Sequence, residues 1–142
     1  MERKGSAVWQ GGLKGGRGTV ATASGVLQDQ QYSFGSRFEE GTGTNPEELI
    51  AAAHAGCYAM ALSAMLEEAG LTPVRVAATA TVTLRPVDGA PTVTAIHLDV
   101  TAQVAGATAA RFAEIADQAK TGCPISRLLR AVEITLTAQL EP

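Results

Sequence analysis

The sequence has few cysteines, few aromatic residues and no block of charge of one sign. Two cysteines among 142 residues are too few for the disulfide framework of small secreted domains, which are shorter and richer in cysteine. Eleven Lys and Arg are scattered among fourteen Asp and Glu, for a net charge of -3. Because no basic patch is present to neutralise phosphates, we expect no nucleic-acid partner.

Long, strongly apolar runs are also missing. Residues 1–4 are followed by glycine and polar residues rather than by the apolar core of a signal peptide. The longest apolar stretch, residues 51–66, is dominated by alanine and interrupted by His54. It falls short of the roughly 20 strongly apolar residues that a membrane span needs. We therefore expect a soluble, cytoplasmic protein with no membrane partner.

The spacing of possible metal ligands is unfavourable. His54 and His97 could complete a four-ligand set with the two cysteines, but the chain has no C-x-x-C or H-x-x-x-H spacing. Such spacings are typical of structural zinc sites. We expect neither a metal nor a bound cofactor, which leaves redox chemistry or inert packing as the roles of the cysteines.

What is present is a globular composition, with 46% hydrophobic and 18% charged residues, which predicts one domain over residues 1–142. Short runs of β-forming residues between glycine-rich turn signals predict strands in the N-terminal third. These runs are residues 7–9, 19–22, 25–27 and 32–34. Residues 36–44 have the composition of a loop.

A long helix is the strongest local prediction. Thr44 or Asn45 suits the N-cap, and Pro46 suits the first turn. The Ala-, Leu- and Met-rich run that follows ends at Gly70, a common helix terminator. The helix is apolar nearly all round, so we expect it to be buried on most sides. A small domain rarely encloses such a helix alone, which favours a dimer.

The rest of the chain predicts an α+β fold. Alternating apolar and polar residues predict strands over 74–84, 93–104 and 132–140. Apolar residues at helical spacing predict an amphipathic helix over 108–120. We expect a short helix to begin at Cys123-Pro124 and to end at Arg130. This order favours antiparallel sheets packed with helices.

The two cysteines have different predicted settings. Cys123 lies at a helix start, where unpaired backbone N–H groups favour a thiolate. Cys57 lies in the middle of the long helix, so a reactive Cys57 needs a cation from elsewhere. On periodicity alone, two unreactive packing cysteines remain an open alternative.

Two motifs carry a resemblance to a known family. Residues 43–57, Gly-Thr-Asn-Pro-Glu-Glu-Leu-Ile-Ala-Ala-Ala-His-Ala-Gly-Cys, resemble the signature of the OsmC/Ohr thiol-dependent hydroperoxide reductases. Residues 120–126, Lys-Thr-Gly-Cys-Pro-Ile-Ser, resemble the second-cysteine motif of that family. The N-terminal third is closer to the OsmC branch. The resemblance implies an OsmC-like fold, with antiparallel sheets around a long central helix in an intertwined homodimer.

The resemblance also implies a function and a site. Cys57 would attack an organic hydroperoxide, or hydrogen peroxide, and Cys123 would close an intramolecular disulfide that an external dithiol reduces. An arginine held by a glutamate would stabilise the Cys57 thiolate. Glu47 matches the glutamate. Arg37 is our choice for the arginine, with Arg17 as the alternative.

Helix geometry constrains this assignment. In a continuous helix, Glu47 lies about 15 Å along the axis from Cys57, too far for contact within one chain. Either the helix begins after Glu47, or the site is completed across a dimer interface, as the resemblance implies.

Several residues have a structural explanation that does not require catalysis, and a non-catalytic function remains an alternative. His54 is better explained as a hydrogen-bonded interface histidine than as a base, and Ser126 as part of a helix start than as a nucleophile. We expect His97 to be structural. The alternative function is a non-catalytic oxidant sensor or a protein that binds a small apolar ligand, since fold does not guarantee chemistry.

Overall fold

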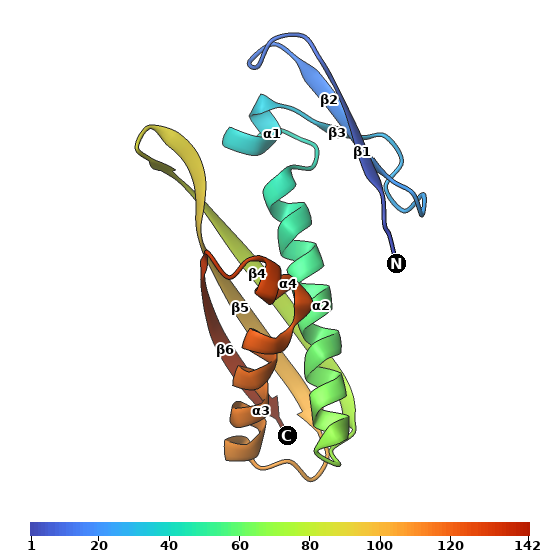
Figure 1. Ribbon diagram of the computed structural model, residues 1–142, viewed down its shortest axis with the longest axis vertical. Coiled ribbons are helices and arrows are strands. Elements are labelled where there is room, and N and C mark those ends of the chain that lie inside the picture. The colour runs from blue at the N-terminus through green and yellow to red at the C-terminus, as the bar shows by residue number, and fades with distance from the viewer. The chain divides into compact units, whose positions relative to one another are not determined.

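The computed structural model describes all 142 residues and divides them into two compact units, Met1–Leu49 and Ile50–Pro142. The first unit contains β1 (Gly5–Gln10), β2 (Arg17–Thr22), β3 (Gln30–Tyr32) and α1 (Phe34–Phe38) (Figure 1). Its strands form an antiparallel sheet in the order β1-β2-β3. The single domain expected from the sequence stays a prediction.

Three local predictions for the first unit were wrong. The strand expected over 32–34 ends at Tyr32, because Ser33 caps a helix that begins at Phe34. Residues 25–27 form a turn rather than a strand, because Gly25 has a positive φ of 77° and the Thr22 N–H donates to the Leu27 carbonyl at 2.9 Å. The expected loop over 36–44 begins inside α1. Ser33 and Ser36 cap the start of that helix reciprocally, at 3.1 and 2.9 Å, which stabilises a helix too short to be recognised by periodicity.

The long helix is confirmed as α2 (Pro46–Glu68). The Asn45 side chain accepts from the Glu48 N–H at 2.8 Å, as an N-cap does. At the other end, Gly70 has a φ of 76° and the Leu71 N–H donates to the Leu66 carbonyl at 2.8 Å. By length and hydropathy alone α2 could cross a membrane. Its Tyr58, however, is fully buried in the core of the second unit.

The second unit contains a three-stranded sheet in the order β4-β5-β6. Its remaining elements are β4 (Pro73–Val87), β5 (Ala90–Val104), α3 (Ala109–Gly122), α4 (Pro124–Leu128) and β6 (Glu133–Glu141). β4 and β5 pair antiparallel through a tight turn at Asp88-Gly89, where both residues have positive φ. β5 and β6 pair in parallel. The expectation of purely antiparallel sheets was therefore wrong here, because the helical crossover through α3 and α4 returns the chain in the same direction.

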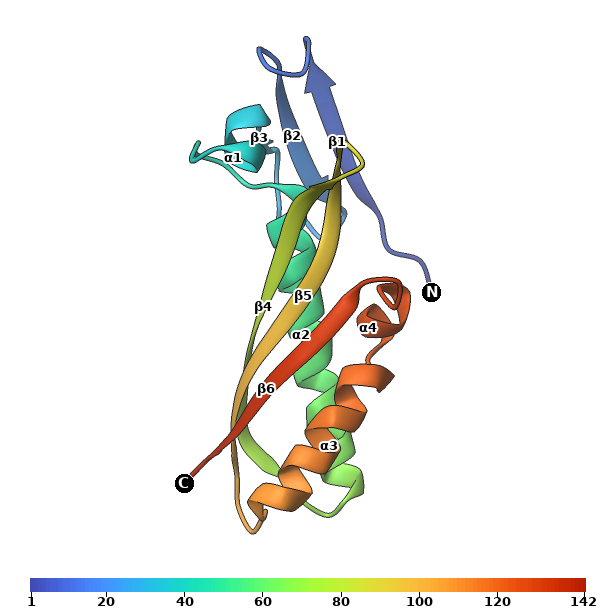
Figure 2. The same cartoon turned by 90° about the vertical axis from the view of Figure 1, so that its left-hand side faces the viewer.

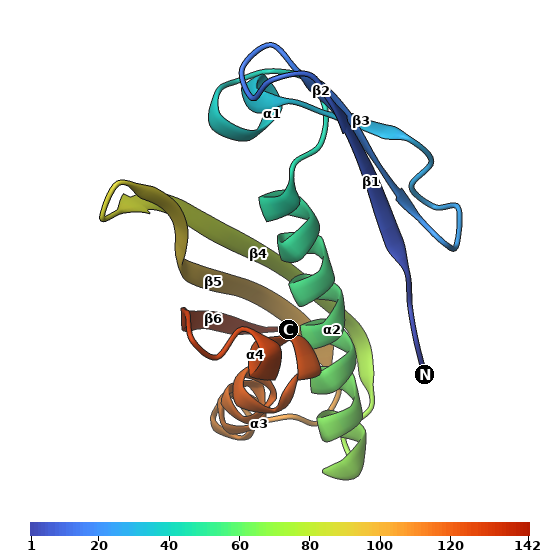
Figure 3. The same cartoon turned by 45° about the horizontal axis from the view of Figure 1, so that its top comes forward.

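One face of this sheet is covered by helices (Figures 2 and 3). Because side chains alternate along a strand, every second residue of β5 points to the helices. The core joins these residues to one face of α2 and one face of α3. Its buried members include Leu98, Val100, Ala102, Tyr58, Leu62, Leu66, Phe112 and Ile115. The core fixes α2, which carries Cys57, beside α3 and α4, which Cys123 joins.

The opposite side of α2 is not buried in the chain. Only His54, Tyr58, Leu62 and Leu66 of this helix are buried. Met60 is 77% exposed, and Ala52, Gly56 and Ala64 are also exposed. The expectation that α2 is buried on most sides was therefore wrong for a single chain.

Candidate functional site

The two cysteines lie next to each other in the second unit. Both are free thiols, and their Sγ atoms are 2.9 Å apart. Cys123 is fully buried, whereas Cys57 is partly exposed. A disulfide bond is about 2.05 Å long, so the two sulfurs need only a small movement to form one.

The local sequence explains how Cys123 reaches Cys57. Cys123 is both the C-cap of α3 and the N-cap of α4, and its N–H donates to the Ala119 carbonyl at 3.0 Å. Pro124 suits the first turn of the new helix because it needs no N–H partner there. Gly122 allows close packing on α2, since a Cβ at this position would lie 2.7 Å from the Met65 methyl carbon.

The surroundings of Cys57 act on its thiol in opposite directions. Burial, followed by the neighbouring Cys123 thiol, raises the pKa of Cys57, whereas the backbone N–H of Ile125 lowers it. Ile125 belongs to the first turn of α4. Burial wins, so the second unit by itself holds Cys57 as a thiol. A reactive thiolate needs additional positive charge.

The first unit contains an ion pair between two other predicted site residues. Arg37 of α1 faces Glu47, the second residue of α2, with Nη2 2.8 Å and Nε 3.1 Å from Oε1. The Nε atom also lies 3.2 Å from Oε2. The loop between the helices holds this geometry, because the Asn45 side chain donates to the Ser36 carbonyl at 3.1 Å. Two of the predicted site residues are thus brought together.

Arg17, the alternative arginine, has no carboxylate partner. It is exposed at the start of β2 and lines, together with Asp29, a cavity of about 260 Å³, without forming an ion pair. Arg37 instead lines a cavity of about 240 Å³ whose other walls are mostly aromatic. Those walls are Trp9, Leu13, Tyr32, Ser33, Phe34 and Phe38. The sequence analysis missed this cavity, although Phe34 and Phe38 have the i, i+4 spacing that places both on one face of a helix.

The histidines and Ser126 have identifiable partners. His54 Nε2 lies 2.8 Å from Ser126 Oγ, and both residues are buried. His54 is therefore an interface histidine, as expected. Ser126 lies in the first turn of α4, as expected, and its side-chain hydrogen bond is to His54. His97 contacts Thr135 and Thr137 on the exposed face of the sheet, which agrees with a structural role.

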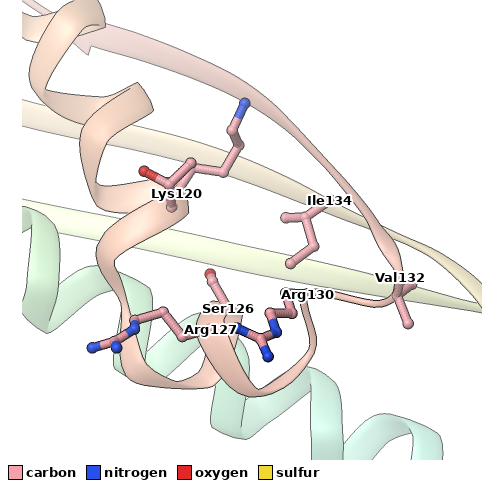
Figure 4. Close-up of a pocket in the computed structure, with 7 residues that line it drawn as sticks. Lys120, Ser126, Arg127, Arg130, Val132 and Ile134 are labelled. Atoms are coloured by element: carbon pink, nitrogen blue, oxygen red, sulfur yellow. The ribbon is translucent and has the colours of Figure 1, made fainter.

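A second cavity, of about 280 Å³, lies beside α4. Figure 4 shows Lys120 and Arg127 on opposite sides of Ser126. Lys120 is paired with Asp117 at 2.7 Å. Arg130 lines the same cavity.

Comparisons with known proteins show the family of the chain. The family model described as "OsmC-like protein" matches residues 39–137. The chain belongs to this family. It is 52% identical, over 99% of its length and 98% of the relative, to the protein named "Peroxiredoxin OsmC" of Escherichia coli strain K12. A Shigella flexneri protein of the same name matches equally.

Solved structures share the fold. The OsmC-like protein from Mycoplasma pneumoniae superposes with a TM-score of 0.76 at 16% identity, covering 100% of this chain and 99% of that one. The organic hydroperoxide resistance protein OhrB of Bacillus subtilis gives 0.68 at 23% identity, covering 97% and 98%. These likenesses confirm the predicted α+β, OsmC-like fold.

Proposed function

We propose that the protein is a thiol-dependent peroxidase that reduces organic hydroperoxides through Cys57 and Cys123. The observation that carries this function is the pair of free thiols 2.9 Å apart, in a chain 52% identical to a protein named as a peroxiredoxin. Inert packing cysteines have no need to be neighbours. A sulfenic acid on one thiol, by contrast, requires a second thiol within reach to form a disulfide.

The two cysteines take different roles because they differ in exposure. Cys57 is partly exposed and meets the peroxide, while Cys123 is fully buried. The Cys57 thiolate attacks one peroxide oxygen, the O–O bond breaks, and the other oxygen leaves as an alcohol after taking a proton. Cys123 then attacks the Cys57 sulfenic acid, releasing water and forming the disulfide. An external dithiol reduces this bond and becomes a disulfide itself.

Arg37 and Glu47 complete the site in this proposal. Arg37 supplies the charge that the Cys57 thiolate lacks, and Glu47 fixes the orientation of the guanidinium. The helix that carries both Glu47 and Cys57 begins at Pro46, so the first of the two alternatives, a later helix start, was wrong. Ten residues of helix span about 15 Å. We therefore assign the Arg37–Glu47 pair that serves one Cys57 to a second copy of the chain.

The exposed side of α2 supports this homodimer. Ala52, Gly56, Met60 and Ala64 recur every four residues and are exposed. The three small ones allow two helices to approach closely. Met60→Lys places a charge in this contact. We expect it to shift the protein from dimer to monomer in sedimentation experiments and to lower peroxidase activity. Leu128→Lys is the matched control, because Leu128 is 74% exposed on α4.

The aromatic cavity beside Arg37 supports an apolar substrate. Its volume of about 240 Å³ suits the hydrocarbon part of an alkyl or aryl hydroperoxide, whose burial is favourable. Hydrogen peroxide has no such part. Two free cysteines in an acidic chain fit a reducing compartment, so we place the protein in the cytoplasm.

Turnover tests this function directly. Purified protein is mixed with cumene hydroperoxide and a dithiol, beside Cys57→Ser and Cys123→Ser. We expect catalysis in the wild type, none in Cys57→Ser, and stalling or over-oxidation in Cys123→Ser. Cumene hydroperoxide should be consumed faster than hydrogen peroxide. Failure of the wild type to consume peroxide while both thiols stay reduced would favour the sensor or ligand-binding alternative.

A further inference from the structure

A buried hydrogen bond joins the two elements that carry the cysteines. His54 lies one helical turn before Cys57 on α2, and Ser126 lies three residues after Cys123 on α4. The 2.8 Å contact between His54 Nε2 and Ser126 Oγ is the one side-chain hydrogen bond that α4 makes. Both residues are almost completely inaccessible to solvent.

The protonation state of His54 fits this contact. Burial lowers the pKa of His54, which keeps the ring neutral near pH 7. Its Nδ1 atom is buried without a hydrogen-bond partner. A bare acceptor nitrogen is more easily tolerated in a protein interior than an unpaired N–H, so we place the proton on Nε2, which donates to Ser126 Oγ.

The docking of α4 sets two features of the thiol pair. One is the 2.9 Å separation of the sulfurs, because Cys123 is the N-terminal cap of α4. The other is the Ile125 N–H, which lowers the pKa of Cys57 from within the same helix. Ser126 is the one buried residue of α4, and Ile125 is the one apolar side chain of this helix that packs against the core.

We propose that the His54–Ser126 hydrogen bond is a positioning clamp that decides how quickly Cys123 captures the sulfenic acid on Cys57. The proposal rests on the peroxidase function. After the first step, the sulfenic acid has two fates. Either Cys123 attacks it, forming a disulfide and water, or a second hydroperoxide oxidises it to a sulfinic acid and leaves as an alcohol. His54 and Ser126 touch neither substrate, so they are positioning residues.

The decisive variant is Ser126→Ala, with Ser126→Thr as the variant that retains the hydroxyl. One ordinary hydrogen bond shifts an equilibrium by about three- to tenfold. We therefore expect Ser126→Ala to reach half over-oxidation at a roughly three- to tenfold lower cumene hydroperoxide concentration, read as Cys57 sulfinic acid by mass spectrometry. Ser126→Thr should follow the wild type. Equal curves for wild type and Ser126→Ala, or equal damage in Ser126→Thr and Ser126→Ala, would overturn the proposal.

Two further variants separate positioning from stability. Ser63→Ala removes a hydroxyl that bonds only within α2, to the Ala59 carbonyl at 2.9 Å, and should leave the over-oxidation curve unchanged. His54→Leu removes the clamp from the other side without leaving an unpaired ring. His54→Leu should give the same over-oxidation curve as Ser126→Ala, and it is the variant that tests the clamp if Ser126→Ala does not fold. A wild-type curve for folded His54→Leu would contradict the clamp.

A peroxide-free measurement distinguishes failure of the clamp from failure of the function. Reduced protein is equilibrated with oxidised dithiothreitol, so that the protein disulfide forms as dithiothreitol is reduced. We expect this disulfide to be about three- to tenfold less favourable in Ser126→Ala than in the wild type. An unchanged dithiol–disulfide equilibrium in Ser126→Ala would contradict the clamp even if the protein is an active peroxidase. A shifted equilibrium would support the clamp even if no peroxide is consumed.

Discussion

The two units of the chain differ in what they supply to the proposed chemistry. The first holds an arginine and a glutamate in a multiply bonded ion pair, with side chains 37% and 13% exposed. The second holds two thiols in contact, with burial raising the pKa of Cys57. The ion pair lies in one unit. The two thiols lie in the other, where no neighbouring cation lowers the pKa of Cys57. In the proposed mechanism, neither unit is sufficient alone.

Removing the charge should have the largest effect. We expect Arg37→Ala to lower peroxidase activity about 10- to 100-fold, because the proposed hydrogen bond from the guanidinium to the thiolate is lost. The thiolate is the reactive form, so the midpoint of the rise in rate with pH should move to higher pH. Alkylation of Cys57 by iodoacetamide across pH measures this shift. Arg17→Ala is the control; an equal loss there would make Arg17 the activating residue.

Removing the carboxylate should have a smaller effect, because Arg37 keeps its charge and loses only its orientation. We expect Glu47→Gln to reduce kcat/KM for cumene hydroperoxide about three- to tenfold. Glu48→Gln changes the neighbouring carboxylate, which contacts Thr44 rather than Arg37. It should retain wild-type kinetics. If both variants behave alike, the Arg37–Glu47 pair has no special role.

The smallest effect concerns stability in the second unit. Burial holds the pKa of His54 below its ordinary value of 6.5, so the unfolded chain binds a proton that the folded chain does not. The free energy of unfolding should therefore fall as pH drops below about 6.5. Urea denaturation at several pH values measures this dependence. It should weaken in His54→Leu and persist in His97→Gln. Parallel curves for His54→Leu and the wild type would assign the pH dependence to other groups.

The sequence predicted the elements with strong periodicity or clear ends. The helix α2 was recognisable from Pro46 and Gly70, and the β4–β5 hairpin from two alternating runs. The parallel direction of β6 was not, because it depends on where a crossover of more than twenty residues returns the chain. The helix α1 was missed because its five residues are held by Ser33 and Ser36 rather than by an apolar face.

The proposed site was predictable only in part. Cys57, Cys123, Arg37 and Glu47 came from a resemblance in two motifs, since periodicity alone left two packing cysteines open. The contact of Cys57 with the Ile125 N–H could not be predicted, because every residue but proline carries this donor. The hydrogen bond between His54 and Ser126 could not be predicted either, because the two residues are 72 positions apart in the sequence.

Complementation between two inactive variants tests most directly whether each site combines residues of two chains. Arg37→Ala and Cys57→Ser chains are unfolded together and refolded as a mixture. If each site combines Cys57 of one chain with Arg37 of another, a mixed dimer regains one intact site. We then expect about a quarter of wild-type activity, since half of the dimers are mixed and each has one working site of two. No recovery above the separate variants, with mixed dimers verified by mass spectrometry, would contradict a site shared between chains.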